Sequence, residues 1–212
     1  MTNNAATHID PRPSFAKAVA LGREVMGNIR PDQFDGPTPC AEFDVRQLTG
    51  HLIGVLQQVA LIGRGRDPFM APEVVEGVAD EALTSAWDEH AGEIDQAWSD
   101  DAVLSTIVTL PWAQMPGAII LMVYISEVTV HTWDLAMATG QHPVWDDEVV
   151  AIAIAGIQQG LPAENRMAQF DQARAGMPEG LADMPPPFGE VVPVPAGSAP
   201  IDRLVAWNGR RP

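Results

Sequence analysis

Residues 44–63 read DVRQLTGHLIGVLQQVALIG and contain the clearest periodic pattern in the chain. Apolar residues recur three or four positions apart, which places them on one face of an α-helix. These residues are Val45, Leu48, Leu52, Val55, Val59 and Ile62. Asp44 is suited to cap the start, because its carboxylate accepts backbone N–H groups that a helix leaves free. Gly63 and Gly65 are expected to end the helix, which then presents one face to a core.

Other stretches on either side of this one also have helical spacing. We predict helices over residues 14–29, 81–98, 116–139 and 146–159. Ser14 is the expected N-cap of the first of these, and Pro31 its stop. Residues 116–139 are apolar on nearly all sides, as is typical of a central, buried helix. The sequence therefore predicts an all-α bundle.

Two segments depart from helical spacing. Residues 103–110 are apolar and β-branched, and they predict either a short strand or an extended connector. Residues 176–200 hold seven prolines, and because proline lacks an N–H and fixes φ, we expect an extended arm on the surface. A short helix over 201–207 should follow. The expected organisation is a bundle over residues 1–161, with residues 162–212 packed on the same domain as an arm and a terminal helix.

Composition narrows the functional classes. The chain has 212 residues, 46% hydrophobic residues, one cysteine and a formal net charge of −16. Such a charge disfavours nucleic acid and anionic membranes as partners, because both attract basic surfaces. The polar N-terminus has no apolar core of a signal peptide, and the apolar run 117–125 is shorter than the roughly 20 residues of a membrane span. We expect a cytoplasmic protein, with a homodimer as a reasonable oligomer.

The chemistry-bearing residues fall in two of the predicted helices. His51 flanks the apolar face of the 44–63 helix, and His131 lies one helical turn after Glu127, so the latter two share a side. Asp134 continues that side. A carboxylate on a buried helix is costly unless it is paired or bound to a cation. Two imidazoles and a carboxylate suit zinc, nickel or iron and leave a coordination position open, with Asp134 either an outer partner or a base.

Simpler interpretations apply to each residue taken alone. Glu127 and His131 have the spacing of an ordinary helix ion pair. His51 and His90 are each consistent with a hydrogen-bonded histidine in the core. Cys40 is consistent with a small buried apolar residue. The spacing differs from H-E-x-x-H, and the sequence holds no paired E-x-x-H, G-x-S-x-G, P-loop or G-x-G-x-x-G motif.

Three motifs in order resemble a known family. They are TPCAEFDV at 38–45 with Leu48 and His51, EVTVHTWDLA at 127–136 with ATGQ at 138–141, and a tail with FG at 188–189, VPVP at 192–195, DRLV at 202–205 and GR at 209–210. This pattern resembles the mycothiol-dependent maleylpyruvate isomerase-like proteins, which belong to the DinB-like superfamily of metal-binding four-helix bundles. The resemblance covers nearly the whole chain and implies an actinobacterial source.

The resemblance implies a site and an activity. His51, Glu127 and His131 would bind one divalent metal, with zinc the expected ion, at one end of an antiparallel bundle. Relatives use the metal to hold a low-molecular-weight thiol such as mycothiol as a thiolate, which attacks an electrophile. For such a site we expect Tyr124 and Trp133 to line the pocket, and either water or Asp134 to accept the thiol proton.

The isomerase itself has a larger C-terminal domain, whereas a proline-rich arm and one short helix follow residue 161 here. We therefore expect a shorter family member that acts as a thiol-dependent transferase or isomerase-like enzyme on a small electrophile. The alternative is a non-catalytic metal- or ligand-binding protein of the same fold.

Overall fold

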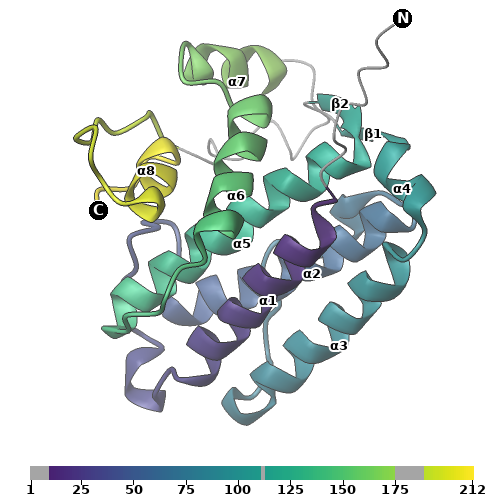
Figure 1. Cartoon of the computed structure of the whole chain (residues 1–212). Coiled ribbons are helices and arrows are strands. Elements are labelled where there is room, and N and C mark those ends of the chain that lie inside the picture. The colour runs from purple at the N-terminus through teal and green to yellow at the C-terminus, as the bar shows by residue number, and fades with distance from the viewer. Residues whose placement is uncertain (1–9, 111–112, 175–188) are drawn as a thin grey trace, which may run out of the picture.

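Four long helices form a bundle around one core (Figure 1). A computed structural model describes residues 10–110, 113–174 and 189–212. The bundle helices are α1 (Arg12–Gly27), α2 (Val45–Gly63), α3 (Leu83–Ala97) and α5 (Gly117–Thr139). In this bundle α5 and α3 each contact both α1 and α2. The all-α, DinB-like fold expected from the sequence is confirmed.

The helices run in two directions. Antiparallel α2 and α5 bring Gln58 next to Tyr124 at one level and His51 next to Glu127 at another. By contrast, α2 and α3 run parallel, because the connection 64–82 returns along α2 before α3 begins. Along this connection, Pro72 lies close to Gly54 and Val75 lies close to Gly50. This long connection therefore lies against the helix that carries His51.

The periodic face of α2 forms the centre of the core, as predicted. All six of its apolar residues are at most 3% exposed. Burial of each such side chain contributes about 1.5–3 kcal/mol to folding. Asp44 caps the helix as expected, since its carboxylate accepts the Gln47 N–H while the Gln47 amide oxygen accepts the Asp44 N–H. The cap and the buried face together fix where α2 begins and which way it is rotated.

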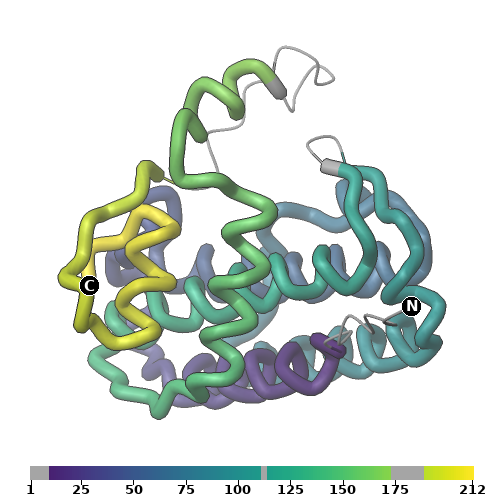
Figure 2. The backbone as a smooth tube through the Cα atoms, turned by 45° about the horizontal axis from the view of Figure 1, so that its top comes forward, coloured from purple at the N-terminus to yellow at the C-terminus, as the bar shows by residue number. Residues whose placement is uncertain are grey.

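The remaining elements pack around this bundle. They are α4 (Asp101–Ser105), β1 (Ile107–Leu110), β2 (Ala113–Pro116), α6 (Asp147–Gly160), α7 (Arg166–Arg174) and α8 (Pro200–Trp207), with 3-10 turns at Pro31–Gln33, Pro68–Met70 and Asp80–Ala82. Strands β1 and β2 pair antiparallel. Helix α6 packs on α5, and α8 packs on both α6 and α5 (Figure 2).

Some boundaries differ from the sequence predictions. The first helix begins at Arg12 and not after Ser14, because Pro13 fits the first helical turn, where its missing N–H costs nothing; Ser14 is buried inside the helix. The 103–110 segment divides into the end of α4 and the strand β1. Helix α7 was not predicted at all. Of the proline-rich arm, residues 189–199 are non-helical, and the Val192 N–H donates to the Ala206 carbonyl; residues 175–188 lie outside the described ranges.

Helix α5 is the one helix in the described ranges that is long and apolar enough to cross a membrane. Its most apolar window is 78% buried inside the protein. The apolar surface of α5 is therefore covered by α1, α2 and α6, as in the core helix of a bundle. Gly140 ends it in the left-handed conformation, with φ at 69°, as its predicted role after the last turn requires.

Candidate metal centre

Three predicted ligands meet where α2 crosses α5. His51 Nε2 lies 3.4 Å from Glu127 Oε1, and His131 Nε2 lies 3.2 Å from the same oxygen. One ligand atom from each of these residues lies within 4.8 Å of the other two. Two ligands bound to zinc at about 2.1 Å with tetrahedral angles are themselves about 3.4 Å apart. The structure thus brings the three side chains to separations that suit a shared cation, while metal binding itself stays a prediction.

The His51 ring has its proton fixed on the far side from Glu127. Its Nδ1 lies 2.9 Å from the carbonyl oxygen of Glu73, in the connection that returns along α2. A carbonyl oxygen can only accept, so Nδ1 must donate. The Nε2 of a neutral ring then presents a lone pair to the Glu127 carboxylate.

A different partner holds the Nδ1 proton of His131, which is also directed away from Glu127. Its Nδ1 donates to Asp134 Oδ2 at 3.0 Å, and Arg210 Nη2 donates to that same oxygen at 2.9 Å. Burial of Asp134 opposes its ionisation, but the hydrogen bond from His131 and the positive charge of Arg210 outweigh it and hold the pKa of Asp134 below its ordinary value. Asp134 is therefore a buried carboxylate that fixes the proton of His131.

These hydrogen bonds leave acceptors facing each other. Two imidazole Nε2 lone pairs and a carboxylate oxygen would repel one another, unless a proton or a cation lies between them. Without a metal, a proton supplies the attraction: burial lowers the pKa of His131, but the negative charge of Glu127 and the hydrogen bonds to both carboxylates raise it overall to about 9. Likewise, burial opposes ionisation of Glu127, yet the two histidines lower its pKa. The cluster is built to hold positive charge.

Solvent reaches the cluster from the side of His51 and Glu127. Their side chains are 12% and 19% exposed, against 5% for His131. The ring of Phe43 stacks on His51, with 4.9 Å between ring centroids. Tyr124, one turn before Glu127, donates its hydroxyl to Gln58 Oε1 at 3.3 Å. Phe43 and Tyr124 are thus neighbours of the cluster residues, and a pocket lined by Tyr124 stays a prediction.

The other predicted residues occupy less direct positions. Trp133 is buried, but it lies two positions after His131 and so projects about 160° away around the helix axis. That Trp133 lines a substrate pocket therefore stays a prediction, and its position on the helix does not favour it. His90 is half-buried between α3 and α2, where it contacts Gln57 and Glu93, apart from the cluster. That environment is consistent with a structural histidine.

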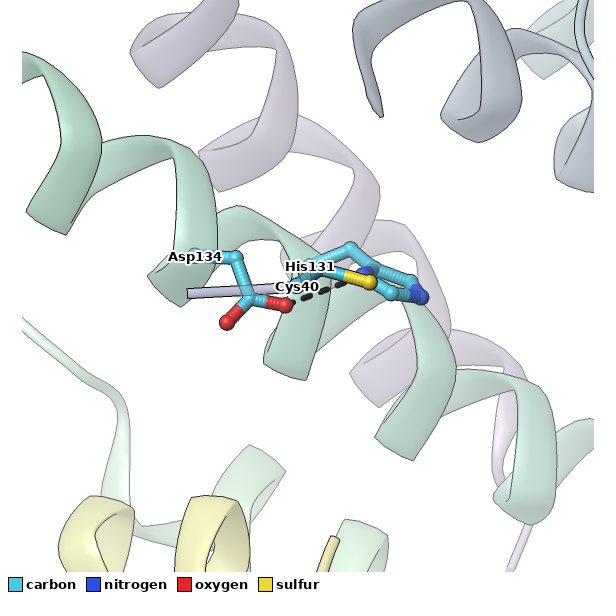
Figure 3. Close-up of side chains that lie close together, drawn as sticks. All are labelled: Cys40, His131 and Asp134. Carbon is cyan, nitrogen blue, oxygen red and sulfur yellow. Dashed lines mark hydrogen bonds and ion pairs between the residues drawn. The ribbon is translucent and has the colours of Figure 1, made fainter. Parts of the chain in front are cut away.

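Cys40 is buried close to His131 and Asp134 (Figure 3). Ligand atoms of these three residues also lie within 4.8 Å of one another. However, Asp134 and His131 Nδ1 already satisfy each other, and Arg210 supplies the positive charge. Burial raises the pKa of the Cys40 thiol to about 11, so it stays protonated at neutral pH. The arrangement favours a structural role for Cys40.

The role of Arg210 in this site was not predicted, although the GR pair at 209–210 belongs to one of the motifs that resemble the family. A carboxylate at position 134 of an apolar helix signals that a cation must lie nearby, because an unpaired buried charge is costly. Arg210 follows α8 and comes from a different part of the chain, 76 residues away. Spacing within one helix carries no information about such a partner.

The fold and this cluster together define a four-helix bundle with a candidate His–Glu–His metal centre. Residues 15–136 match the mycothiol maleylpyruvate isomerase N-terminal domain, and the chain belongs to that family. Two relatives from Mycobacterium tuberculosis, strains H37Rv and CDC 1551, are both described as uncharacterized proteins. Each is 28% identical over 203 residues, which cover 95% of this chain and 98% of the relative. No solved structure was found to match.

Proposed function

We propose that this protein is a metal-dependent enzyme that uses a small thiol of the mycothiol type to transfer a group to, or isomerise, a small electrophile. The observation that carries the proposal is the convergence of His51 Nε2, His131 Nε2 and Glu127 Oε1, with both ring protons directed elsewhere. Family membership supports the thiol, since the matched domain is named for mycothiol maleylpyruvate isomerase.

The donor set fits a divalent metal, with zinc the first choice and nickel or iron also suited. Imidazole and carboxylate are ligands that all three accept. Three protein ligands leave at least one coordination position open, which distinguishes a catalytic site from a closed structural site. The partly exposed side of His51 and Glu127 is where that position would face.

The chain's own residues would prepare the site for thiol chemistry. A bound divalent metal lowers the pKa of a coordinated thiol and so keeps it as the attacking thiolate. Glu127 balances the charge, and Asp134 holds His131 in the binding tautomer. Because Asp134 is buried and held by Arg210, we assign it an orienting role, and the thiol proton would pass to water at the exposed side. Phe43 and Tyr124 would contact the bound molecules.

Metal analysis and turnover test the proposal separately. Protein purified without a histidine tag should contain about one zinc per chain, and His51→Ala should lose it. His142→Ala is the matched control, because His142 is exposed and lies outside the cluster. Zinc-loaded protein should then form mycothiol conjugates or isomerised products with members of a panel of small electrophiles.

The outcomes separate the alternatives. Zinc binding without turnover on any electrophile would favour the non-catalytic metal- or ligand-binding protein. A protein that binds neither zinc, nickel nor iron would overturn the metal centre and the enzyme together.

The cellular location and the partners of the protein also stay proposals. We place the protein in the cytoplasm, because a single cysteine suits a reducing compartment. We expect small molecules rather than nucleic acid or anionic membranes as partners, because the net charge is −16. A homodimer stays a prediction, which light scattering of the eluted protein would test.

A further inference from the structure

The connection between α2 and α3 lies unusually close to α2 at residues 72–75. A methyl group built at Gly50 would lie 2.4 Å from the carbonyl oxygen of Val75. One built at Gly54 would lie 2.6 Å from the carbonyl oxygen of Pro72 and 3.2 Å from that of Glu73. These neighbours are backbone atoms, which cannot swing aside as a side chain can. Only glycine at both positions permits this approach.

The two glycines are one helical turn apart, so they form a shallow notch on one face of α2. The Val75 N–H donates to the Gly50 carbonyl at 3.1 Å and fastens the connection in the notch. Glu73 lies between the two contact points, and its carbonyl oxygen accepts from His51 Nδ1 at 2.9 Å. The notch therefore determines how close the Glu73 carbonyl comes to the histidine.

We propose that residues 72–75 act as a positioning strap for His51, seated by Gly50 and Gly54, and that this strap sets the metal affinity of the site. This inference rests on the metal centre of the proposed function and deepens it. Because the strap's carbonyl accepts from Nδ1, it orients the ring so that Nε2 faces Glu127, where the metal would bind. Outer partners of this kind change metal affinity by about 10–100-fold when they are lost.

The role belongs to the backbone of the strap and not to its side chains. Pro72 and Glu73 are exposed, and the Glu73 side chain is not part of the contact with His51. Glu73→Ala keeps the carbonyl and should bind zinc as the wild type does. Gly54→Ala should push the strap outward and weaken zinc binding by about 10-fold or more.

Matched glycine substitutions separate positioning from general destabilisation. Gly63→Ala is in the same helix and would place its methyl 2.6 Å from the Trp98 ring nitrogen, far along α2 from the strap. It should lower the melting temperature of the metal-free protein without changing zinc affinity. Gly92→Ala, inside α3, meets nothing within 4 Å; it should leave zinc affinity unchanged and raise the melting temperature slightly, because alanine favours a helix more than glycine does.

A second variant avoids any clash. Pro72→Gly removes the ring that restricts the strap and leaves α2 unchanged, so the protein should fold. It should weaken zinc binding several-fold, which keeps the inference testable if Gly54→Ala does not fold.

The experiment measures zinc affinity by competition with a chromophoric chelator, the melting temperature of the metal-free protein, and the His51 tautomer from ring ¹⁵N shifts. We expect Gly54→Ala to weaken zinc binding more than Gly63→Ala does, even if both variants lose the same amount of melting temperature. We also expect the His51 ring of Gly54→Ala to lose the pure Nδ1–H tautomer. Zinc affinities of Gly54→Ala and Pro72→Gly within twofold of the wild type would overturn the strap alone. A wild type that binds no zinc would overturn the proposed function and the strap together.

Discussion

Arg210 donates to the carboxylate of Asp134 at 2.9 Å inside the protein, and both side chains are almost fully buried. Through this pair the C-terminal end of the chain contacts the helix that carries Glu127 and His131. Arg210 also donates to the carbonyl of Asn208, so the turn after α8 is fixed by the same guanidinium. The last residues of the chain therefore help to orient a proposed metal ligand through Asp134.

Removal of Arg210 should destabilise the protein strongly. Arg210→Ala would leave Asp134 as a buried charge with only His131 to compensate it, and breaking a buried pair costs about 3–5 kcal/mol. Urea unfolding monitored by tryptophan fluorescence measures this free energy. Arg211→Ala is the control, because Arg211 is exposed and should change stability by less than about 0.5 kcal/mol. Equal stabilities of the two variants would contradict the role of the pair.

Cys40 should be unreactive in the folded protein. Burial raises its pKa to about 11, and the thiolate is the reactive form, so its reaction with iodoacetamide should still accelerate between pH 9 and 10.5. An ordinary cysteine with a pKa near 8.5 is nearly fully ionised at about pH 10, so its reaction rate no longer rises there. Because Cys40 is the one cysteine in the sequence, mass spectrometry of the intact protein reports this reaction directly. A rate that levels off near pH 9.5, as for the urea-unfolded protein, would show the thiol to be accessible and unperturbed.

Zinc affinity should fall as the pH falls. In the metal-free protein Glu127 and Asp134 raise the pKa of His131 to about 9 against the effect of burial, so below that pH zinc must displace a proton from Nε2. The apparent affinity should therefore decrease by about tenfold for each pH unit between 8 and 6. Chelator competition at fixed ionic strength measures it, and an affinity that is constant over this range would mean that zinc binds elsewhere.

The sequence allowed much of this fold and site to be predicted, for identifiable reasons. The three-and-four spacing of α2 and the turn between Glu127 and His131 are local patterns, and local patterns decide helices and their faces. That His51 meets those two residues followed from family resemblance, because spacing alone cannot bring two helices together. The contacts that orient the site, from the Glu73 carbonyl and from Arg210, depend on tertiary packing. No periodicity in the sequence indicates these contacts. Gly50 and Gly54 are one turn apart on α2, and such a glycine pair indicates that another backbone segment packs closely against the helix.

Anomalous diffraction at the zinc absorption edge, from crystals of the zinc-loaded protein, tests the central claim most directly. We predict one strong peak per chain, about 2.0–2.2 Å from His51 Nε2, His131 Nε2 and a Glu127 carboxylate oxygen. The peak should vanish in Glu127→Gln crystals grown in the same way. A zinc peak at any other position, or three empty side chains in protein saturated with zinc, would contradict the account.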